Sequence, residues 1–325
     1  MAVMGIESSA HTLGVGIVDN GKILANERRM YKISNKGIVP STVADFHSGN
    51  VYGAIRDAIK ASHISLEDIS AIGYTRGPGL GACLRIGYLA AYSISSELKI
   101  PIIPINHGVA HIEIARHLNK FKDPLALYVS GGNSQILGIV EEPYRHYHIY
   151  GETFDMGVGN MLDSFARKAG MNPAWGSSVA KAAEFGSYIR MPYTVKGMDF
   201  TFSGLMTNAI AMLKKFSIHD VSYSLQETAF SMLCEATERA MMLTGKSELL
   251  ICGGVAQSFR LREMLSTIAQ SHNGKFGFAP NEYNADNGAM IALVAEKMHN
   301  GKYVSRQKNL DVKQRYRVDE AKITW

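Results

Sequence analysis

Cysteine is scarce in this sequence of 325 residues, which contains only Cys83, Cys234 and Cys252. No two of them form the closely spaced pair that is typical of a zinc finger or a redox site, and an odd number cannot complete a disulfide framework. The sequence therefore predicts a protein that needs no disulfide bonds, and a reducing compartment fits it best.

The sequence also lacks a long apolar run. No stretch reaches the roughly 18 uninterrupted apolar residues expected of a membrane-spanning helix, and the longest candidate, residues 82–96, contains Arg85. The first residues carry no basic leader, and Glu7 interrupts their apolar run, which does not fit a signal peptide. We expect a cytoplasmic protein with no membrane partner.

Neither sign of charge dominates: 34 Lys and Arg face 29 Asp and Glu, a net charge of +5. Hydrophobic residues make up 46% and charged residues 19%, which excludes a disordered or fibrous chain. The excess is local, because residues 302–325 hold seven basic and three acidic residues, a net charge of +4 that leaves +1 for the rest. This basic segment is a candidate contact for a polyanion or an acidic partner.

Strand and helix patterns alternate along the chain. Short apolar stretches predict strands over residues 3–6, 14–18, 71–75, 100–105, 125–129, 135–140 and 249–252. Helical spacing of apolar residues predicts helices near Val51, from Asn106, and over 83–97, 226–244, 258–269 and 286–298. Such alternation indicates an α/β fold with mainly parallel strands. At roughly 100 to 200 residues per domain, the length suggests two domains or one large unit.

A weak repeat relates two parts of the chain. Residues 3–18 align with residues 125–140, and both copies end in Gly-Ile-Val, at Gly16–Val18 and Gly138–Val140. Each copy reads as strand, polar turn and strand. The similarity fits either two unrelated hairpins or a duplicated domain, in which two phosphate-binding hairpins would enclose a nucleotide.

His107 and His111 stand where a strand pattern gives way to a helix. Four residues make about one helical turn, so both imidazoles lie on one face and suit a metal ion; two unrelated histidines fit the spacing as well. Asp286 fits a helix N-cap, or it could supply an oxygen ligand. A helical zinc peptidase is disfavoured, because the motif needs Glu directly after the first histidine and this chain has Gly108.

Three more segments place glycine or aspartate where a strand or helix ends. In Tyr128–Ser134, paired glycines could bind an anion through their N–H groups or simply form a tight hairpin. Cys252–Ala256 offers a helix N-terminus to an anion or purine, or permits close packing. In Gly157–Asp163, the aspartate could bind a ribose or lie on a solvated helix face.

Together these segments resemble the universal tRNA threonylcarbamoyltransferase family, specifically the archaeal catalytic subunit of the KEOPS complex. Relatives were formerly described as O-sialoglycoprotein endopeptidases. The resemblance covers nearly the whole chain and rests on Gly5–Thr12, Arg76–Gly81, Asn106–His111, Leu127–Asn133, Gly197–Gly204 and Asp286–Met290.

The resemblance implies an actin/Hsp70/sugar-kinase-like (ASKHA) α/β fold, with two duplicated domains around a nucleotide cleft. This agrees with the repeated hairpin. We expect a first domain over residues 1–122, a second over 123–302, and a basic C-terminal tail over 303–325 that returns to the first domain.

The resemblance also implies a reaction. The threonylcarbamoyl group moves from threonylcarbamoyl-AMP to N6 of the adenosine next to the anticodon, in tRNAs that read codons starting with adenine. The expected partners are tRNA, the small kinase subunit of KEOPS, either separate or fused on the C-terminal side, and the other small subunits. The alternatives are a small-molecule kinase and a non-catalytic nucleotide-binding scaffold of the same fold.

Site residues follow by matching positions. One metal ion, iron or zinc, is expected on His107, His111, Tyr128 and Asp286, and the catalytic positions are His107, His111, Ser130 and Gly131. The positions expected to contact threonylcarbamoyl-AMP or an ATP-type nucleotide are Tyr128, Val129, Ser130, Gly131, Gly132, Asn133, Asp163, Gly176, Gly254 and Ser258.

This chain departs from the family pattern at the ribose and adenine end of the expected pocket. Ala180 stands where a Glu is common, Ser258 stands where an Asn is common, and the usual Pro-Gly-Gly reads Ala174-Trp175-Gly176. A serine hydroxyl can still bond a base, whereas an alanine cannot replace a carboxylate bound to ribose. For tRNA phosphates, the candidate contacts besides the tail are Arg28, Arg29, Lys32 and Lys36, which could equally form a solvated charged face.

Overall fold

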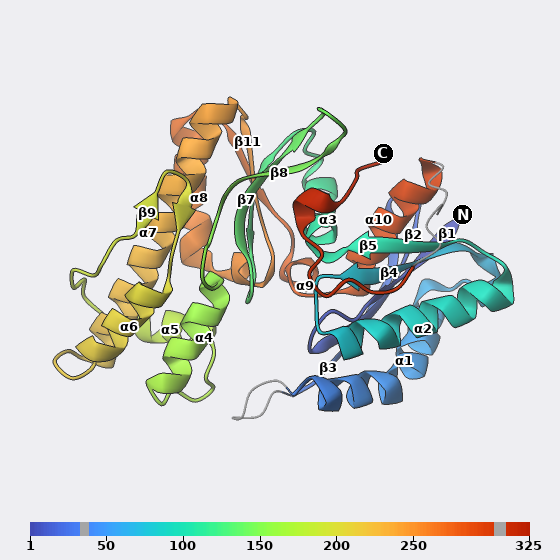
Figure 1. Ribbon diagram of the computed structural model, residues 1–325, viewed down its shortest axis with the longest axis horizontal. Helices are drawn as coiled ribbons and strands as arrows, with labels where there is room; N and C mark the ends of the chain where they lie inside the picture. Colours follow the sequence, from blue (N-terminus) through green and yellow to red (C-terminus); the bar gives the residue numbers. More distant parts are fainter. Residues whose placement is uncertain (33–38, 302–309) are drawn as a thin grey trace. The chain divides into compact units, whose positions relative to one another are not determined.

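The computed structural model describes residues 1–32, 39–301 and 310–325. The chain forms two compact units (Figure 1). Unit 1 comprises Met1–Leu118, Val140–Tyr147 and Pro280–Trp325, and unit 2 comprises Asn119–Ile139 and His148–Ala279. This division differs from the expected boundaries at 122 and 302. The residues after Pro280 belong to unit 1, because their long helix packs on its sheet.

A five-stranded sheet forms the centre of unit 1, in the order β3–β2–β1–β4–β5. β1 pairs antiparallel with β2 and parallel with β4. All of β1 is buried, as expected of a central strand covered on both faces. The strands are β1 (Ala2–Glu7), β2 (Thr12–Asp19), β3 (Lys22–Met30), β4 (Ile69–Gly77) and β5 (Ile102–Asn106).

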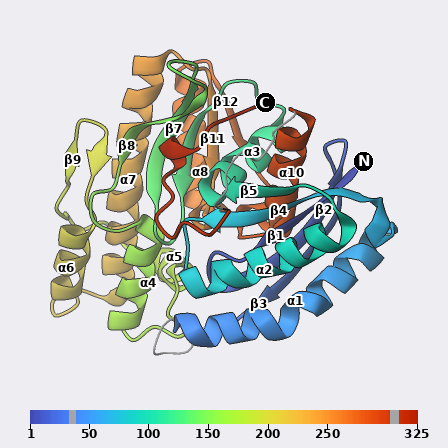
Figure 2. The ribbon, with the colours of Figure 1, turned by 45° about the vertical axis from the view of Figure 1, so that its right-hand side comes forward.

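Helices cover both faces of this sheet (Figures 1 and 2). α1 (Pro40–Ser62) and α2 (Gly81–Leu98) lie on one face, and α10 (Gly288–Asn300) lies on the other with α3 (His107–Asn119) beside it. The short helix α9 (Asn281–Asn284) precedes α10. α3 and α10 carry or adjoin the candidate metal ligands, so their placement decides the site.

α10 approaches the sheet closely because glycines face it. A Cβ atom on Gly5 would lie 2.1 Å from the backbone nitrogen of Ala292, and one on Gly16 would lie 2.2 Å from that of Ala289. A Cβ atom on Gly288 would in turn lie 2.2 Å from the Gly16 nitrogen. Backbone therefore meets backbone at the start of α10, where no side chain fits.

Unit 2 repeats the topology of unit 1, with its sheet in the order β12–β11–β6–β7–β8. In both units the first strand has an antiparallel partner on one side and two parallel strands on the other. The second hairpin turns more tightly: Val129 pairs with Ser134, whereas Glu7 pairs with Gly14. The strands are β6 (Leu125–Val129), β7 (Ser134–Val140), β8 (His146–Glu152), β11 (Glu248–Cys252) and β12 (Lys275–Phe278).

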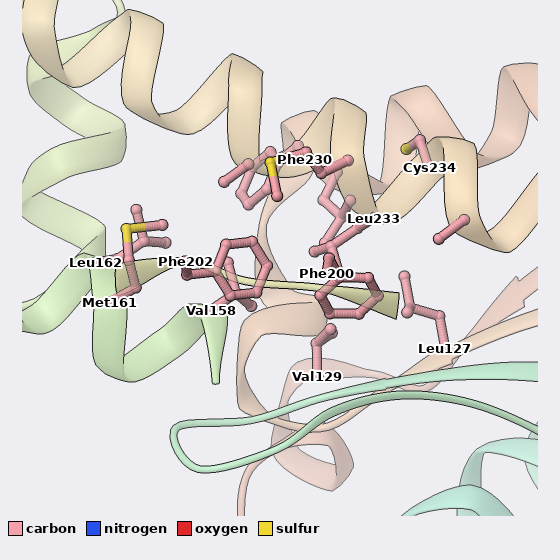
Figure 3. Close-up of a cluster of buried hydrophobic side chains, with 14 of the residues drawn as sticks. Leu127, Val129, Val158, Met161, Leu162, Phe200, Phe202, Phe230, Leu233 and Cys234 are labelled. Carbon is pink, nitrogen blue, oxygen red and sulfur yellow. The ribbon is translucent and has the colours of Figure 1, made fainter. Parts of the chain in front are cut away.

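The core of unit 2 joins its longest helix, α7 (Ile218–Thr244), to β6. Aromatic side chains of the 200–202 segment fill the space between Phe230 of the helix and Leu127 of the strand (Figure 3). α7 begins at Ile218 rather than at Gln226, because the Ser217 side chain caps it by accepting a hydrogen bond from the Asp220 N–H.

The remaining elements of unit 2 are smaller. The helices are α4 (Val158–Lys168), α5 (Gly176–Ala183), α6 (Ser203–Met212) and α8 (Phe259–Ser271), and a short hairpin joins β9 (Val195–Lys196) to β10 (Asp199–Phe200). Across the described ranges, no helix combines the length and the apolar character needed to cross a membrane.

The glycine contact at the start of α10 generates a stability prediction. Gly16→Ala should lower the free energy of unfolding by about 1–3 kcal/mol, because the new methyl group would overlap the Ala289 backbone. The matched control is Gly53→Ala in α1, where nothing lies within 4 Å of the added atom. Urea unfolding followed by circular dichroism measures both variants, and equal midpoints would contradict the close packing.

Candidate metal centre and nucleotide-binding turns

His107 and His111 open α3, which starts directly after β5. Asn106 caps the helix, since its side-chain oxygen accepts a hydrogen bond from the Val109 N–H at 3.1 Å. The two imidazole rings are perpendicular, with centroids 4.7 Å apart. The one-turn spacing therefore brings both histidines to one face of the helix, as the sequence predicts.

Asp286 joins the two histidines. Its Oδ1 lies 3.2 Å from His111 Nε2 and 3.5 Å from His107 Nε2, so one ligand atom from each residue lies within 4.8 Å of the others. Asp286 is not the cap of α10: the side chain of Asn287 has that role and accepts from the Met290 N–H at 3.0 Å. Asp286 is therefore not the N-cap that the sequence allowed, and its carboxylate lies where a third ligand atom could be.

Glu7, at the end of β1, stands behind the histidine pair and was missed as a site residue. It is fully buried, and its Oε2 lies 3.0 Å from His107 Nδ1. The carboxylate also accepts from Thr75 Oγ1 and from the Ser9 N–H, both at 2.6 Å. A metal-ligating histidine usually gives its other ring nitrogen such a partner. The available signal was an acid at the end of an apolar strand, since a buried carboxylate needs partners.

These contacts set the protonation of the cluster. Burial alone would lower the pKa of His107, but the charge and hydrogen bond of Glu7 outweigh it and raise that pKa to about 9. Burial keeps the pKa of His111 low. Burial would raise the pKa of Asp286, but the hydrogen bond from His111 and the charge of His107 lower it. The cluster thus pairs ionised carboxylates with a cation, and two imidazoles with a carboxylate are donors that suit zinc or iron.

Tyr128, the fourth expected ligand, lies in unit 2 as the fourth residue of β6, and its side chain is buried. The other three expected ligands belong to unit 1. Unit 1 thus brings three of the four together by itself.

The turn after β6 is closed by its own hydrogen bonds. The Ser130 N–H donates to the Asn133 carbonyl at 2.8 Å, and the Asn133 N–H donates to Ser130 Oγ at 3.1 Å. The start of α4 supports the turn, because the Asn160 N–H donates to the Gly131 carbonyl at 3.0 Å. The N–H of Ser130, a position expected to contact the nucleotide, is therefore engaged inside the turn.

Two amides of this turn remain for a ligand. Within the described part of the chain, no hydrogen bond engages the N–H of Gly131 or Gly132, and both residues are exposed. Nothing lies within 4 Å of where a Gly132 Cβ would be. Successive free N–H groups in an open turn are a typical anion-binding arrangement.

The glycine pair after β11 packs on the same part of unit 2. Gly253 has a φ of +93°, and a Cβ atom there would lie 2.4 Å from the Val129 carbonyl oxygen. Gly254 faces open space. Ser258 caps α8, with its hydroxyl accepting from the Leu261 N–H at 3.4 Å. The Ser258 hydroxyl, which is expected to contact the adenine base, therefore also caps α8.

Asp163 and Gly176 contact each other. Asp163 Oδ1 accepts from the Gly176 N–H at 2.7 Å, which ties α4 to the first residue of α5. A carboxylate can accept about four hydrogen bonds, and the contact with Gly176 uses one of them. Ala180 lies one turn further along α5 and adds no polar group.

Comparison with known proteins decides the family. The sequence profile of the family tRNA N6-adenosine threonylcarbamoyltransferase (TsaD) matches residues 22–293. The chain belongs to this family. A relative of that name from Thermococcus sibiricus is 42% identical, and the alignment covers 100% of both chains. The family expected from the sequence motifs is confirmed.

A second relative is longer. The "probable bifunctional tRNA threonylcarbamoyladenosine biosynthesis protein" of Thermoplasma volcanium is 42% identical over 100% of this chain and 62% of its own length. This transferase chain therefore matches part of a larger protein in that organism.

Solved structures confirm the ASKHA-like fold class. HypF from T. kodakarensis has a TM-score of 0.61 at 14% identity, covering 90% of this chain and 46% of that one. The activator of 2-hydroxyisocaproyl-CoA dehydratase from Clostridium difficile, solved with bound ADPNP, has a TM-score of 0.53 at 15% identity, covering 95% and 100%. At these identities the likeness concerns the fold alone.

The contact between Glu7 and His107 generates a prediction for the metal centre. Glu7→Gln should weaken binding of Zn²⁺ by about 10–100-fold, because the acceptor charge that orients the imidazole is lost. Competition with a chromophoric chelator measures the affinity. Glu67→Gln, which changes an exposed acid of unit 1, is the control. Equal affinities in the two variants would mean that Glu7 does not orient the ligand.

Proposed function

We propose that this chain transfers the threonylcarbamoyl group from threonylcarbamoyl-AMP to N6 of the adenosine next to the anticodon of tRNA, in the cytoplasm. The observation that carries the proposal is the convergence of His107, His111 and Asp286 in a member of the threonylcarbamoyltransferase family. We place it in a KEOPS-type complex with a small kinase subunit and further small subunits. The longer bifunctional relative supports a partner domain on the same chain.

The residues of unit 1 fit an iron or zinc ion. Glu7 Oε2 lies 3.0 Å from Nδ1 of His107, so a metal ion would take the place of the Nε2 proton of that imidazole, and His111 Nε2 and Asp286 Oδ1 face the same point. A bound ion would supply Lewis-acid polarisation of the donor and stabilise negative charge. Tyr128 is the proposed fourth ligand.

The turn of unit 2 is suited to the donor phosphate. The amine N6 attacks the carbamoyl carbon, a C–N bond forms, the C–O bond to AMP breaks and N6 gives up a proton. Negative charge then grows on the departing phosphate. The free N–H groups of Gly131 and Gly132 would stabilise that charge. Asp163 would bind the ribose, and Gly254 and Ser258 the adenine.

The basic residues proposed for tRNA differ in how available they are. Arg29 bonds Asp57 at 2.5 Å, whereas no described residue pairs with the side chain of Arg28 or Lys32. In the tail, Arg317 pairs with Asp319 at 3.1 Å, and Lys313 with Glu320 at 3.0 Å.

Arg315 is an available cation of the described tail. It is exposed, and it makes no hydrogen bond or ion pair with any residue that the structure describes. Lys36, Lys302, Arg306 and Lys308 lie outside the described residues.

A transfer assay tests the reaction. With donor, tRNA, metal and the other complex subunits supplied, the wild type should form threonylcarbamoyladenosine. His111→Ala should lose both bound metal and product, because it removes a buried ligand of the cluster. His148→Ala, an exposed position of unit 2, should keep both. No product from the wild type would sink the proposal, and full product from His111→Ala would refute the ligand assignment.

The tail generates a separate prediction for tRNA binding. Arg315→Gln should weaken binding and reduce the slope of log affinity against log salt by about one, because one phosphate contact is lost. Arg317→Gln is the matched control and should have a smaller effect, since Asp319 already neutralises that guanidinium. Filter binding across a salt series measures both slopes; identical slopes in wild type and Arg315→Gln would exclude Arg315 from the interface.

A further inference from the structure

A buried ion pair joins α3 and α10 at a second point, away from the ligand cluster. Glu113 of α3 is completely buried, and Lys297 of α10 donates to its Oε2. The two helices lie side by side in both views of the fold (Figures 1 and 2). Glu113 follows His111 by two residues on α3, and Lys297 lies well along α10 from Asp286.

Glu113 gathers donors from four places in unit 1. Besides Lys297, its carboxylate accepts from Arg116 at 2.9 Å, from Tyr147 Oη at 2.6 Å and from Trp325 Nε1 at 3.3 Å. Lys297 and Arg116 both form ion pairs with this carboxylate, so its neutralisation would leave two partly buried cations without their shared partner.

The pair constrains the geometry of the metal centre. α3 carries both histidines, and the turn before α10 carries Asp286. Each helix is a rigid element of 13 residues. α10 packs on the sheet and α3 follows β5 directly, and the ion pair adds a direct link between the two helices at a second point.

We propose that the buried Glu113–Lys297 ion pair is a positioning device that holds Asp286 within ligand distance of His107 and His111. The inference rests on the metal centre of the proposed function. An ion pair with a merely structural role would change the stability of unit 1 and leave the metal affinity of the folded protein unaltered. Metal affinity therefore separates the two roles.

The decisive variant is Glu113→Gln, compared with Glu227→Gln. Glu227 forms a more exposed ion pair in unit 2, where Arg260 donates to both of its oxygens at 2.8 and 2.7 Å. Zn²⁺ affinity is measured by chelator competition on folded protein, with no donor or tRNA present. Glu113→Gln should bind Zn²⁺ about tenfold more weakly, at the lower end of the range for residues that support ligands. Glu227→Gln should bind it as the wild type does.

Lys297 supplies a second pair of variants. Lys297→Arg keeps the charge and should retain the affinity, whereas Lys297→Met should lose it to the same extent as Glu113→Gln. The Lys297 side chain is 21% exposed, so Lys297→Met decides the matter even where Glu113→Gln fails to fold.

The outcomes separate this inference from the proposed function. Wild-type affinity in Glu113→Gln or Lys297→Met overturns the positioning role, and so does an equal loss in Glu227→Gln, because the effect would then be general. A wild type that binds no metal overturns the positioning role together with the metal centre. A wild type that binds metal but transfers no threonylcarbamoyl group counts against the reaction alone.

Discussion

Direct backbone contact between β2 and α10 is the constraint on which the candidate centre depends. Asp286 and His111 are 175 positions apart in the chain, and they meet because Gly16 and Gly288 let the helix start rest on the strand. Side chains at these two positions would separate the strand from the helix by about the thickness of a methyl group. Since Asp286 Oδ1 lies only 3.2 Å from His111 Nε2, such a shift is large on the scale of a metal–ligand bond.

Two buried carboxylates then hold the histidines and helices that the glycine contact brings together. Glu7 holds the Nδ1 side of His107, and Glu113 holds α3 to α10 beyond His111. A buried ion pair contributes little net stability, because desolvation offsets much of the attraction. The pair instead fixes the orientation of the side chains, because a buried carboxylate that loses its partners destabilises the folded protein. The histidine pair thus lies between two charges that resist reorientation, which is what a preorganised ligand set requires.

Local signals in the sequence were sufficient for part of this structure. The spacing of His107 and His111 predicted that both imidazoles lie on one face of a helix. The repeated Gly-Ile-Val pointed to two hairpins of the same topology. The half-polar edge strand β3 and helix α6, whose apolar residues show no clean period, were not predicted. Helices α4 and α5 were also missed, although their apolar residues recur at helical spacing. Glu7 was missed for a different reason: its partner His107 lies 100 positions away, and no local pattern shows that contact.

The duplicated hairpins differ in what their turns bind, and this difference supports the proposed division of roles. In unit 1 the last residue of the first strand is Glu7, whose carboxylate accepts from the Ser9 N–H of the following turn. In unit 2 the equivalent last residue is Val129, which offers no carboxylate. The Ser9 N–H of unit 1 thus donates to a carboxylate of the same unit. The N–H groups of Gly131 and Gly132 in unit 2 have no such acceptor among the described residues. The open amides of the second turn favour negative charge from outside the chain, and the proposed donor phosphate would supply it.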